Sequence, residues 1–357
     1  MNRKHTSKAL ALLLALAIAL LGVIPAFAAG TPKAALDGVL NYLDGKSASL
    51  AFAEDESEWK ALALARGGKT VPAAYLASVE DAVKTNKLTL GTDYARVVLA
   101  LTAMGIDASD FAGKNLVEPL TDIDFVTANM PNGATYALLA LYSKDYYNKI
   151  PAGYDSELVD ALMGEYTAAG WTAGWAAGVD IDATAMALQA LAPYAARADV
   201  KKAIDESVAL LAGAQLESGA FATDYGFGAF DDACGTAQVI TALSVLGKDA
   251  AAALPRDAVA ALLAFQEEDG GFDAAYGENP WADSQAAYAL VAYDRYKAGA
   301  NSLFDMSDAF VDPTPPTKLE KWEAKLPGWL RFIVSWPNWI EWVIFYGFFG
   351  WIWNVVK

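Results

Sequence analysis

Six Ala-rich stretches with one helical pattern recur along this chain, and their recurrence restricts the possible folds more than any other feature. In each stretch a polar or acidic residue precedes an apolar run rich in alanine. The marker alanines, which are 37, 40, 50, 52 and 50 residues apart, are Ala63, Ala100, Ala140, Ala190, Ala242 and Ala292. A period of this size is typical of stacked copies of one supersecondary unit, none of which buries its apolar face alone.

A second set of amphipathic runs alternates with the Ala-rich stretches. Each carries apolar residues three and four positions apart, which predicts a helix with one buried face. These runs cover residues 34–43, 75–83, 115–123, 156–166, 200–215 and 256–266. Twelve helices in six hairpins predict an all-α fold for residues 30–300. We expect an α/α6 toroid with the Ala-rich helices inside, and an open solenoid of the same hairpins is the alternative.

Residues 1–28 have the features of a secretory signal peptide. Basic residues at the start lead into the apolar run 9–24, and Ala26-Phe27-Ala28 provides small residues for cleavage. An uncleaved membrane anchor is the alternative. Cleavage removes His5, the only histidine, together with Arg3, Lys4 and Lys8, so the formal charge changes from −17 to −20. We therefore expect an exported, strongly acidic mature protein.

This composition excludes several classes of function. A surface so acidic lacks the basic footprint that nucleic-acid binding needs. Cys234 is the only cysteine, so the chain forms no internal disulfide. A mature chain without histidine cannot form Ser/His/Asp or Cys/His catalytic groups, which leaves carboxylates as the acid and base. We expect no cofactor and no bound metal.

The composition changes after residue 300. Residues 301–321 form a predicted linker, in which Asp312-Pro-Thr-Pro-Pro-Thr317 favours an extended chain. Residues 322–357 hold seven of the eleven tryptophans. The longest apolar run of this tail, Trp342 to Trp353, would span only ~18 Å as a helix, against ~30 Å for the hydrocarbon core. We predict a tail, Trp322–Lys357, that lies in the membrane interface; a tilted span and packing on the toroid are the alternatives.

Polar residues stand at or just before the start of every Ala-rich helix. If these helices are parallel, their N-termini surround one mouth, which is the expected site. A side chain of this kind usually caps its helix by accepting from free backbone amides, and capping is the ordinary interpretation of each one. Together they predict a ring of polar groups: Asp55, Asp93, Asn132, Asp182, Asp232 and Asp283.

Three similar loops, 170–182, 219–232 and 270–283, precede the last three Ala-rich helices and are rich in aromatic residues. Phe221 and Phe272, each two residues after a turn glycine, are predicted to plug between helices. The looser aromatic residues and the acids are candidates for contacting a ligand. The predicted binding residues are Trp171, Trp175, Asp180, Asp182, Tyr225, Asp231, Asp232, Tyr276, Trp281 and Asp283.

A repeated motif in these loops resembles a known family. Leu211-x3-Gln215-x3-Gly219-x-Phe221 and Leu262-x3-Gln266-x3-Gly270-x-Phe272 are similar to the QW repeat of the squalene cyclase and protein prenyltransferase superfamily, with Phe in place of Trp. The resemblance covers about residues 34–299 and implies the same toroid. The runs that begin at Asp180 and Thr236 look most like exported bacterial members, some of them related to cobalamin-binding toroids.

The motifs of the enzymes in that superfamily are incomplete here. The Asp-x-Asp-Asp acid motif of terpenoid cyclases stops at Asp180-Ile-Asp182, which Ala183 follows, and Asp231-Asp232 lacks the upstream acid. Asp232 and Cys234 match two zinc ligands of the prenyltransferases, but no mature histidine supplies the third. We therefore expect a non-catalytic, surface-retained module that binds a small molecule, a glycan or a surface protein. The alternative is a carboxylate-dependent glycan-active hydrolase or a terpene cyclase-like enzyme.

Overall fold

The computed structural model describes residues 30–310, except positions 130, 227, 275 and 276, so the predicted signal peptide and tail lie outside the described residues. This part of the chain is mainly helical, which confirms the predicted all-α class. A two-residue antiparallel hairpin pairs β1 (Asp273–Ala274) with β2 (Gly277–Glu278). The α-helices are α2 (Pro32–Lys46), α3 (Ser57–Arg66), α4 (Ala73–Lys84), α5 (Gly91–Ala103), α6 (Ile123–Thr127), α7 (Asn132–Tyr142), α8 (Tyr154–Gly164), α9 (Ile181–Leu191), α10 (Ala198–Ala214), α11 (Ala233–Val245), α12 (Ala258–Leu263) and α13 (Pro280–Ala298).

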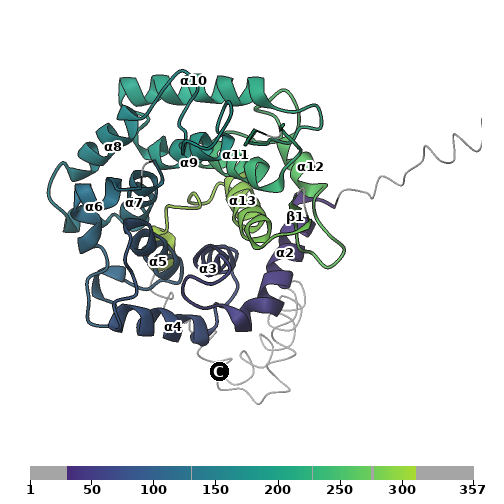
Figure 1. Cartoon of the computed structure of the whole chain (residues 1–357). Coiled ribbons are helices and arrows are strands. Elements are labelled where there is room, and N and C mark those ends of the chain that lie inside the picture. Colours follow the sequence, from purple (N-terminus) through teal and green to yellow (C-terminus); the bar gives the residue numbers. More distant parts are fainter. Residues whose placement is uncertain (1–29, 130, 227, 275–276, 311–357) are drawn as a thin grey trace, which may run out of the picture. The chain divides into compact units, whose positions relative to one another are not determined.

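The odd-numbered helices α3 to α13, here called the inner set, lie around a common centre, and the even-numbered helices α2 to α12, the outer set, lie outside them (Figure 1). Each inner helix contacts the next one along the chain, and α13 also contacts α3. The series of contacts therefore returns to its first member. Most outer helices pack against an inner neighbour, as α8 does against α7 and α12 against α11.

Alanine lets the inner helices approach one another closely. All six marker alanines are buried, with exposed fractions of 2% or less. Five of them are followed directly by a buried leucine, such as Leu64 or Leu243. A methyl side chain occupies little space between two helix axes, so neighbouring inner helices can pack along their whole length.

The third hairpin departs most from the sequence prediction. The amphipathic run 115–123 does not form one helix; it divides into a 3₁₀ turn at Glu118–Thr121 and the short helix α6. Pro119 stands near the start of that turn, and Asp122 caps α6 by accepting from the Phe125 amide at 3.1 Å. A proline followed by a strong capping residue favours two short helices over one long helix.

The Gln residues of the repeated motif tie the outer helices to one another. Gln215 Nε2 donates to the carbonyls of Gly219 and Arg256, and Gln215 Oε1 accepts from the Arg256 amide, each at 2.9 Å. Gln266 Nε2 likewise donates to Ala35 in α2 at 2.9 Å and to Gly270 at 3.1 Å. The motif thus joins the end of α10 to the segment before α12, and the end of α12 to α2.

The segment after α13 packs against the body of the protein. The compact unit ends at Ala309, so residues 301–309 belong to the helical body, although the sequence placed them in the linker. The buried Arg66 holds this segment: its guanidinium donates to the carbonyls of Leu303, Ser302 and Asp305 and pairs with Asp308. Three apolar side chains beside it are buried as well: Leu303, Phe304 and Met306.

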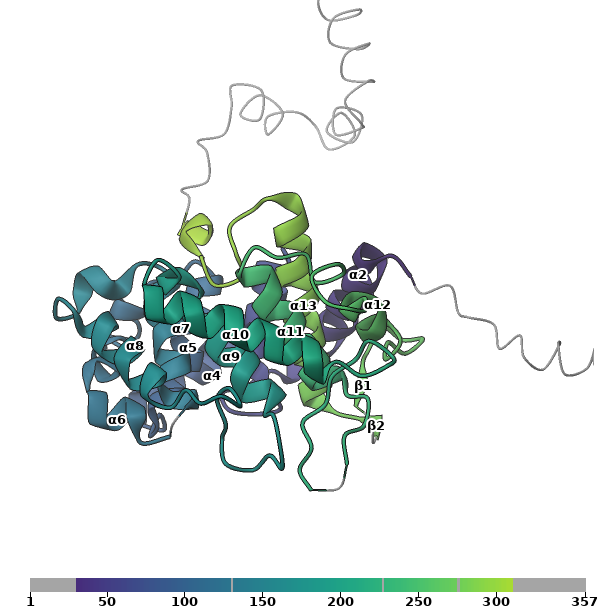
Figure 2. The same cartoon turned by 90° about the horizontal axis from the view of Figure 1, so that it is seen from above.

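The two ends of the inner helices differ. The loops before α9, α11 and α13 lie on one side of the body, and the segment after α13 lies on the opposite side (Figure 2). Within residues 30–310, no helix has the length and apolar character needed to cross a bilayer.

Candidate functional site

The last three inner helices begin with three side-chain caps. Asp180 caps α9 by accepting from the Ala183 amide at 3.0 Å, and Asp232 caps α11 by accepting from the Gly235 amide at 2.9 Å. Asn279 caps α13 through the Trp281 amide at 2.9 Å. The sequence had placed Asp182 and Asp283 in this role, but both lie inside the first turn. Their carboxylates are therefore available for other contacts.

One arrangement recurs at the start of these three helices. A buried aromatic residue from the preceding loop donates its backbone amide to a side chain in the first turn of the helix. The pairs are Trp171 with Thr184 at 3.2 Å, Phe221 with Thr236 at 2.9 Å, and Phe272 with Asp283 at 2.8 Å. Thr184, Thr236 and Asp283 thus occupy equivalent positions.

Two further equivalent positions follow from this register. Two residues before the shared acceptor stand Asp182, Cys234 and Trp281, and two residues after it stand Met186, Gln238 and Gln285. All six line one cavity of about 330 Å³. Residues four apart share one face of a helix, so each helix presents two successive side chains to the same space.

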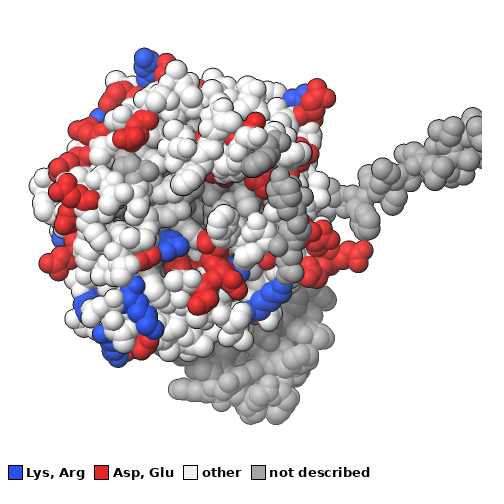
Figure 3. Space-filling view, in the orientation of Figure 1, with Lys and Arg blue, Asp and Glu red and all other residues white. Residues whose placement is uncertain are grey.

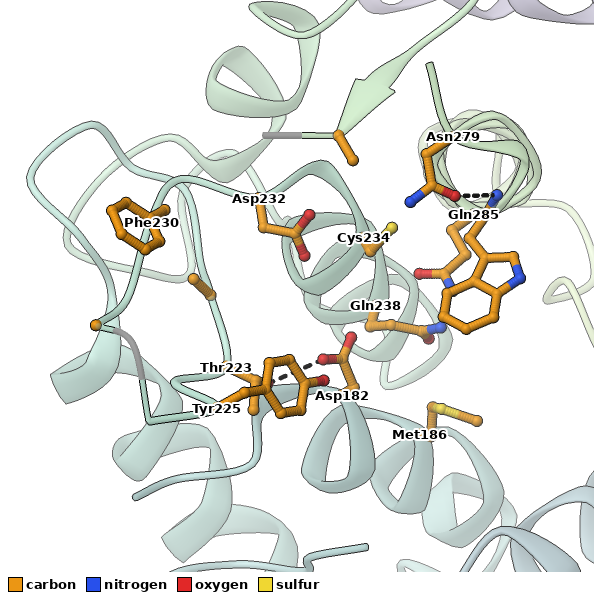
Figure 4. A pocket seen from close by; sticks show the side chains of 14 residues that line it. Asp182, Met186, Thr223, Tyr225, Phe230, Asp232, Cys234, Gln238, Asn279 and Gln285 are labelled. Carbon is orange, nitrogen blue, oxygen red and sulfur yellow. Dashed lines mark hydrogen bonds between the residues drawn. The ribbon is translucent and has the colours of Figure 1, made fainter. Parts of the chain in front are cut away.

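The loops complete the wall of this cavity. Thr223, Tyr225 and Phe230 come from the loop before α11, and Ala274 comes from β1. Tyr225, Phe230 and Trp281 keep exposed fractions of 55%, 52% and 56%. Such exposure is uncommon for large aromatic side chains and marks a surface able to bind. Figure 4 shows the carboxylates of Asp182 and Asp232 pointing into the same space, with Gln238 and Gln285 facing each other from α11 and α13.

Asp182 is the most strongly perturbed acid of the cavity. Its Oδ2 accepts from the Thr223 hydroxyl at 2.9 Å. Burial, with Asp232 and Asp180 nearby, raises the pKa of Asp182 to about 6, although the Thr223 hydrogen bond acts in the opposite direction. Burial and the charge of Asp182 also raise the pKa of Tyr225 to about 12. Low solvent access and like charges both favour the protonated carboxyl, so Asp182 titrates close to neutral pH.

Burial also shifts the pKa of two neighbouring groups, Asp232 and Cys234. Burial raises the pKa of Asp232, while the backbone amide of Gly235 opposes that change. Burial, with Asp232 and Asp182 nearby, raises the pKa of the Cys234 thiol, which stays protonated at neutral pH. Cys234 is only partly buried and faces the cavity.

Hydrogen bonds connect Gln238, which lines the cavity, to two buried polar side chains that do not line it. Gln189 Nε2 donates to Gln238 Oε1 at 2.9 Å, and Gln238 Nε2 donates to the Tyr288 hydroxyl at 2.6 Å. Gln285 Oε1 is buried and has no hydrogen-bond partner within the described structure. A buried acceptor of this kind is uncommon in a folded protein and suits a donor brought by a ligand.

Of the predicted residues, the cavity brings together Asp182, Tyr225, Asp232 and Trp281. The others that the structure describes lie elsewhere. Trp171 is a core residue with no exposed surface, and its Nε1 donates to the Leu162 carbonyl at 2.7 Å. Trp175 is 77% exposed outside the cavity. Tyr276 lies outside the described residues.

The remaining predicted acids do not reach the cavity either. Asp180 is buried, and its Oδ2 also accepts from the Ala173 amide at 2.9 Å, so its carboxylate belongs to the loop and the cap. Asp231 is exposed. Asp283 is buried and contributes to a second cavity, of about 270 Å³, next to Lys60 and Asp55.

Several lining residues are not among those predicted from the sequence, and they include Met186, Thr223, Phe230, Gln238, Asn279 and Gln285. Three of them could have been found by aligning the three helices on their shared first-turn acceptor, because Met186, Gln238 and Gln285 fall at one repeat position. Thr223 and Phe230 depend on the path of an irregular loop, which the repeat does not specify. Among the residues that the structure describes, no group of three or more His, Cys, Asp or Glu is placed to hold a metal ion.

Comparison with known proteins adds no family to this description. No protein-family model matches the chain, and no curated protein has a significantly similar sequence.

Proposed function

We propose that this protein is an exported, surface-retained α/α6 toroid of the terpenoid cyclase and prenyltransferase-repeat type, which binds a ligand without transforming it. The toroid is supported by the contacts that run through the inner set and return from α13 to α3. Export and retention are supported by the composition of residues 1–28 and 322–357. The ligand is a small molecule, a glycan or an exposed segment of a surface protein.

One observation carries the binding role: the cavity at the N-termini of α9, α11 and α13. Its volume of about 330 Å³ lies within the ~300–1,000 Å³ typical of ligand pockets. Half-exposed aromatic side chains surround its opening, and a few polar groups converge inside. The segment after α13 packs at the other end of the inner helices, so the open loops offer the direct route of entry.

Thermal denaturation of the purified protein with panels of glycans, corrinoids and isoprenoids tests this role, because a ligand that binds the native state raises its melting temperature. A ligand that stabilises the protein should lose its effect with Trp281→Ala or Tyr225→Ala. Trp175→Ala is the matched control, since Trp175 is exposed but does not line the cavity. A ligand effect that persists in Trp281→Ala and Tyr225→Ala but disappears in Trp175→Ala would contradict the proposed site.

A carboxylate-dependent hydrolase is the second candidate, and Asp182 is the observation that favours it. A carboxyl with a pKa of about 6, next to a second acid in an aromatic cavity, has the properties of a general acid. Asp232 is a weak partner for it, because its carboxylate already caps α11. Release of reducing sugar from a glycan that binds, and its loss in Asp182→Asn, would establish the enzyme; binding without turnover supports the module.

A further inference from the structure

The charge of the cavity is one-sided. Asp182 and Asp232 are the charged side chains of its described lining, and no lysine or arginine is among those residues. The charged groups that act on the pKa of Asp182 are acids as well. They are Asp232, which caps α11, and Asp180, which caps α9. The other titratable groups around Asp182 are Tyr225 from the loop, Cys234 from α11 and Tyr136 from α7. These three groups are neutral at physiological pH.

Two basic residues of the inner helices, Lys60 in α3 and Arg96 in α5, act on other acids. Arg96 pairs with Asp93 at 2.9 Å. Arg96 and Lys60 both lower the pKa of Glu56, which burial raises. Figure 3 shows acidic side chains gathered beside the central hollow of this face, over α3. A positive ligand would therefore meet an excess of negative charge at the rim and inside the cavity.

The remaining lining suits a cation with an apolar part. Tyr225, Phe230 and Trp281 present aromatic rings at the opening, and aromatic faces attract cations through their quadrupole. Met186 adds a polarisable thioether on the next turn of α9. Inside, the carboxylate of Asp182 and the unpartnered Oε1 of Gln285 are acceptors, which calls for a donor on the ligand.

We infer, on the basis of the proposed binding role of this cavity, that its ligand is a protonated organic amine. The ammonium group lies between Asp182 and Gln285 Oε1, and the apolar or aromatic part lies among Tyr225, Phe230 and Trp281. A glycan or a neutral isoprenoid would leave the two carboxylates without a counter-charge. A protonated amine supplies the positive charge that the described lining lacks, together with N–H donors for Asp182 and Gln285 Oε1.

A pair of probes that differ in charge tests this inference. 2-Phenylethylamine is protonated at neutral pH, and 2-phenylethanol has the same skeleton with an uncharged hydroxyl. Titration calorimetry on the purified protein should show the amine binding at least roughly tenfold more tightly than the alcohol, since a charge partner in a partly desolvated site gives an effect of this size. Asp182→Asn should remove that preference. Asp231→Asn, an exposed acid next to the α11 cap, should retain it.

The pH dependence is a second readout. Asp182 attracts the ammonium group only when its carboxyl is ionised. The affinity for the amine should therefore fall about tenfold between about pH 7.5 and about pH 5, whereas the affinity for the alcohol should stay constant. Equal binding of amine and alcohol, a preference that survives in Asp182→Asn, or no amine binding at all would overturn the inference. Alcohol binding that Trp281→Ala abolishes would still support the cavity as a binding site, so failure of the charge argument is separable from failure of the proposed function.

Discussion

At the scale of single residues, the packing around Asp182 opposes the ionisation of its carboxyl. Ala183 and Ile181 beside it are buried, and the loop that carries Thr223 covers it. Burying a carboxyl near two other acids costs free energy when it is ionised. Asp182 lines the cavity, and both candidate functions use its carboxyl: one as the partner of a bound ligand, the other as a general acid.

Asp182→Asn should stabilise the protein at neutral pH. The pKa of Asp182 is about 6 in the folded protein against 3.8 as the reference value, so the wild-type carboxyl lowers the free energy of unfolding as pH rises from about 4 to about 6. Above pH 6 this cost is constant, on the order of 3 kcal/mol. Asparagine keeps an acceptor for the Thr223 hydroxyl.

Urea denaturation at several pH values measures the effect. The advantage of Asp182→Asn over the wild type should be largest above pH 6 and should disappear near pH 4. Asp231→Asn, which removes an exposed acid that does not line the cavity, is the matched control. A wild-type protein that is more stable than Asp182→Asn at pH 7 would contradict the assigned environment.

At the scale of elements, the loop between α12 and α13 joins the first and last hairpins. Gly270 has a φ of +95°, and a Cβ at this position would lie 2.6 Å from the carbonyl oxygen of Gly38 in α2. Gln266 bonds to Ala35 one turn earlier in the same helix. The glycine of the repeated motif is thus required both for its backbone conformation and for the close approach of α2.

Gly270→Ala should therefore destabilise the protein more than Gly226→Ala does. Gly226 has nearly the same φ, +96°, but among the described residues no atom beyond its chain neighbours lies within 4 Å of its would-be Cβ. The control isolates the conformational cost, about 1–2 kcal/mol, from the clash with α2. Thermal unfolding of both variants measures the difference, and equal melting temperatures would show that α2 adjusts its position freely.

The sequence predicts the elements of this fold better than it predicts the site. Helix positions follow from periodic alanines and leucines, whose burial depends on neighbours three and four residues away. The run 115–123 was mispredicted because Pro119 and Asp122 interrupt an otherwise helical pattern. Within the site, Trp171 and Trp175 look alike in sequence, and only the Leu162 carbonyl and the buried Thr184 contact distinguish the core residue from the exposed one.

At the scale of the whole molecule, the two ends of the inner helices have different roles. The end with the long loops is lined by aromatic and acidic residues, and the other end is covered by residues 301–309. Arg66 links this segment to α3 through three backbone carbonyls and Asp308. A buried guanidinium with this many acceptors is a specific anchor, because removing either side leaves polar groups unsatisfied.

Arg66→Met should release the segment while the inner helices stay folded. The carbonyls of Leu303, Ser302 and Asp305 would lose their donor, so the segment should open more often. Hydrogen exchange at the Met306 amide, which donates to the Ser143 carbonyl at 2.8 Å, should become at least about tenfold faster. Arg197→Met, which removes exposed ion pairs, is the control. Unchanged protection of Met306 would show that apolar packing alone holds the segment.

The contact between α13 and α3 completes the series of contacts between the inner helices, because α13 packs between α11 and α3. Until that helix is available, α3 and α11 each keep one apolar flank without a neighbour, and α2 lacks the loop that Gly270 brings to it. A chain in which α13 is not yet available can build separate hairpins, but it cannot complete its core by adding them one at a time. Folding therefore waits for nearly the whole of residues 30–309.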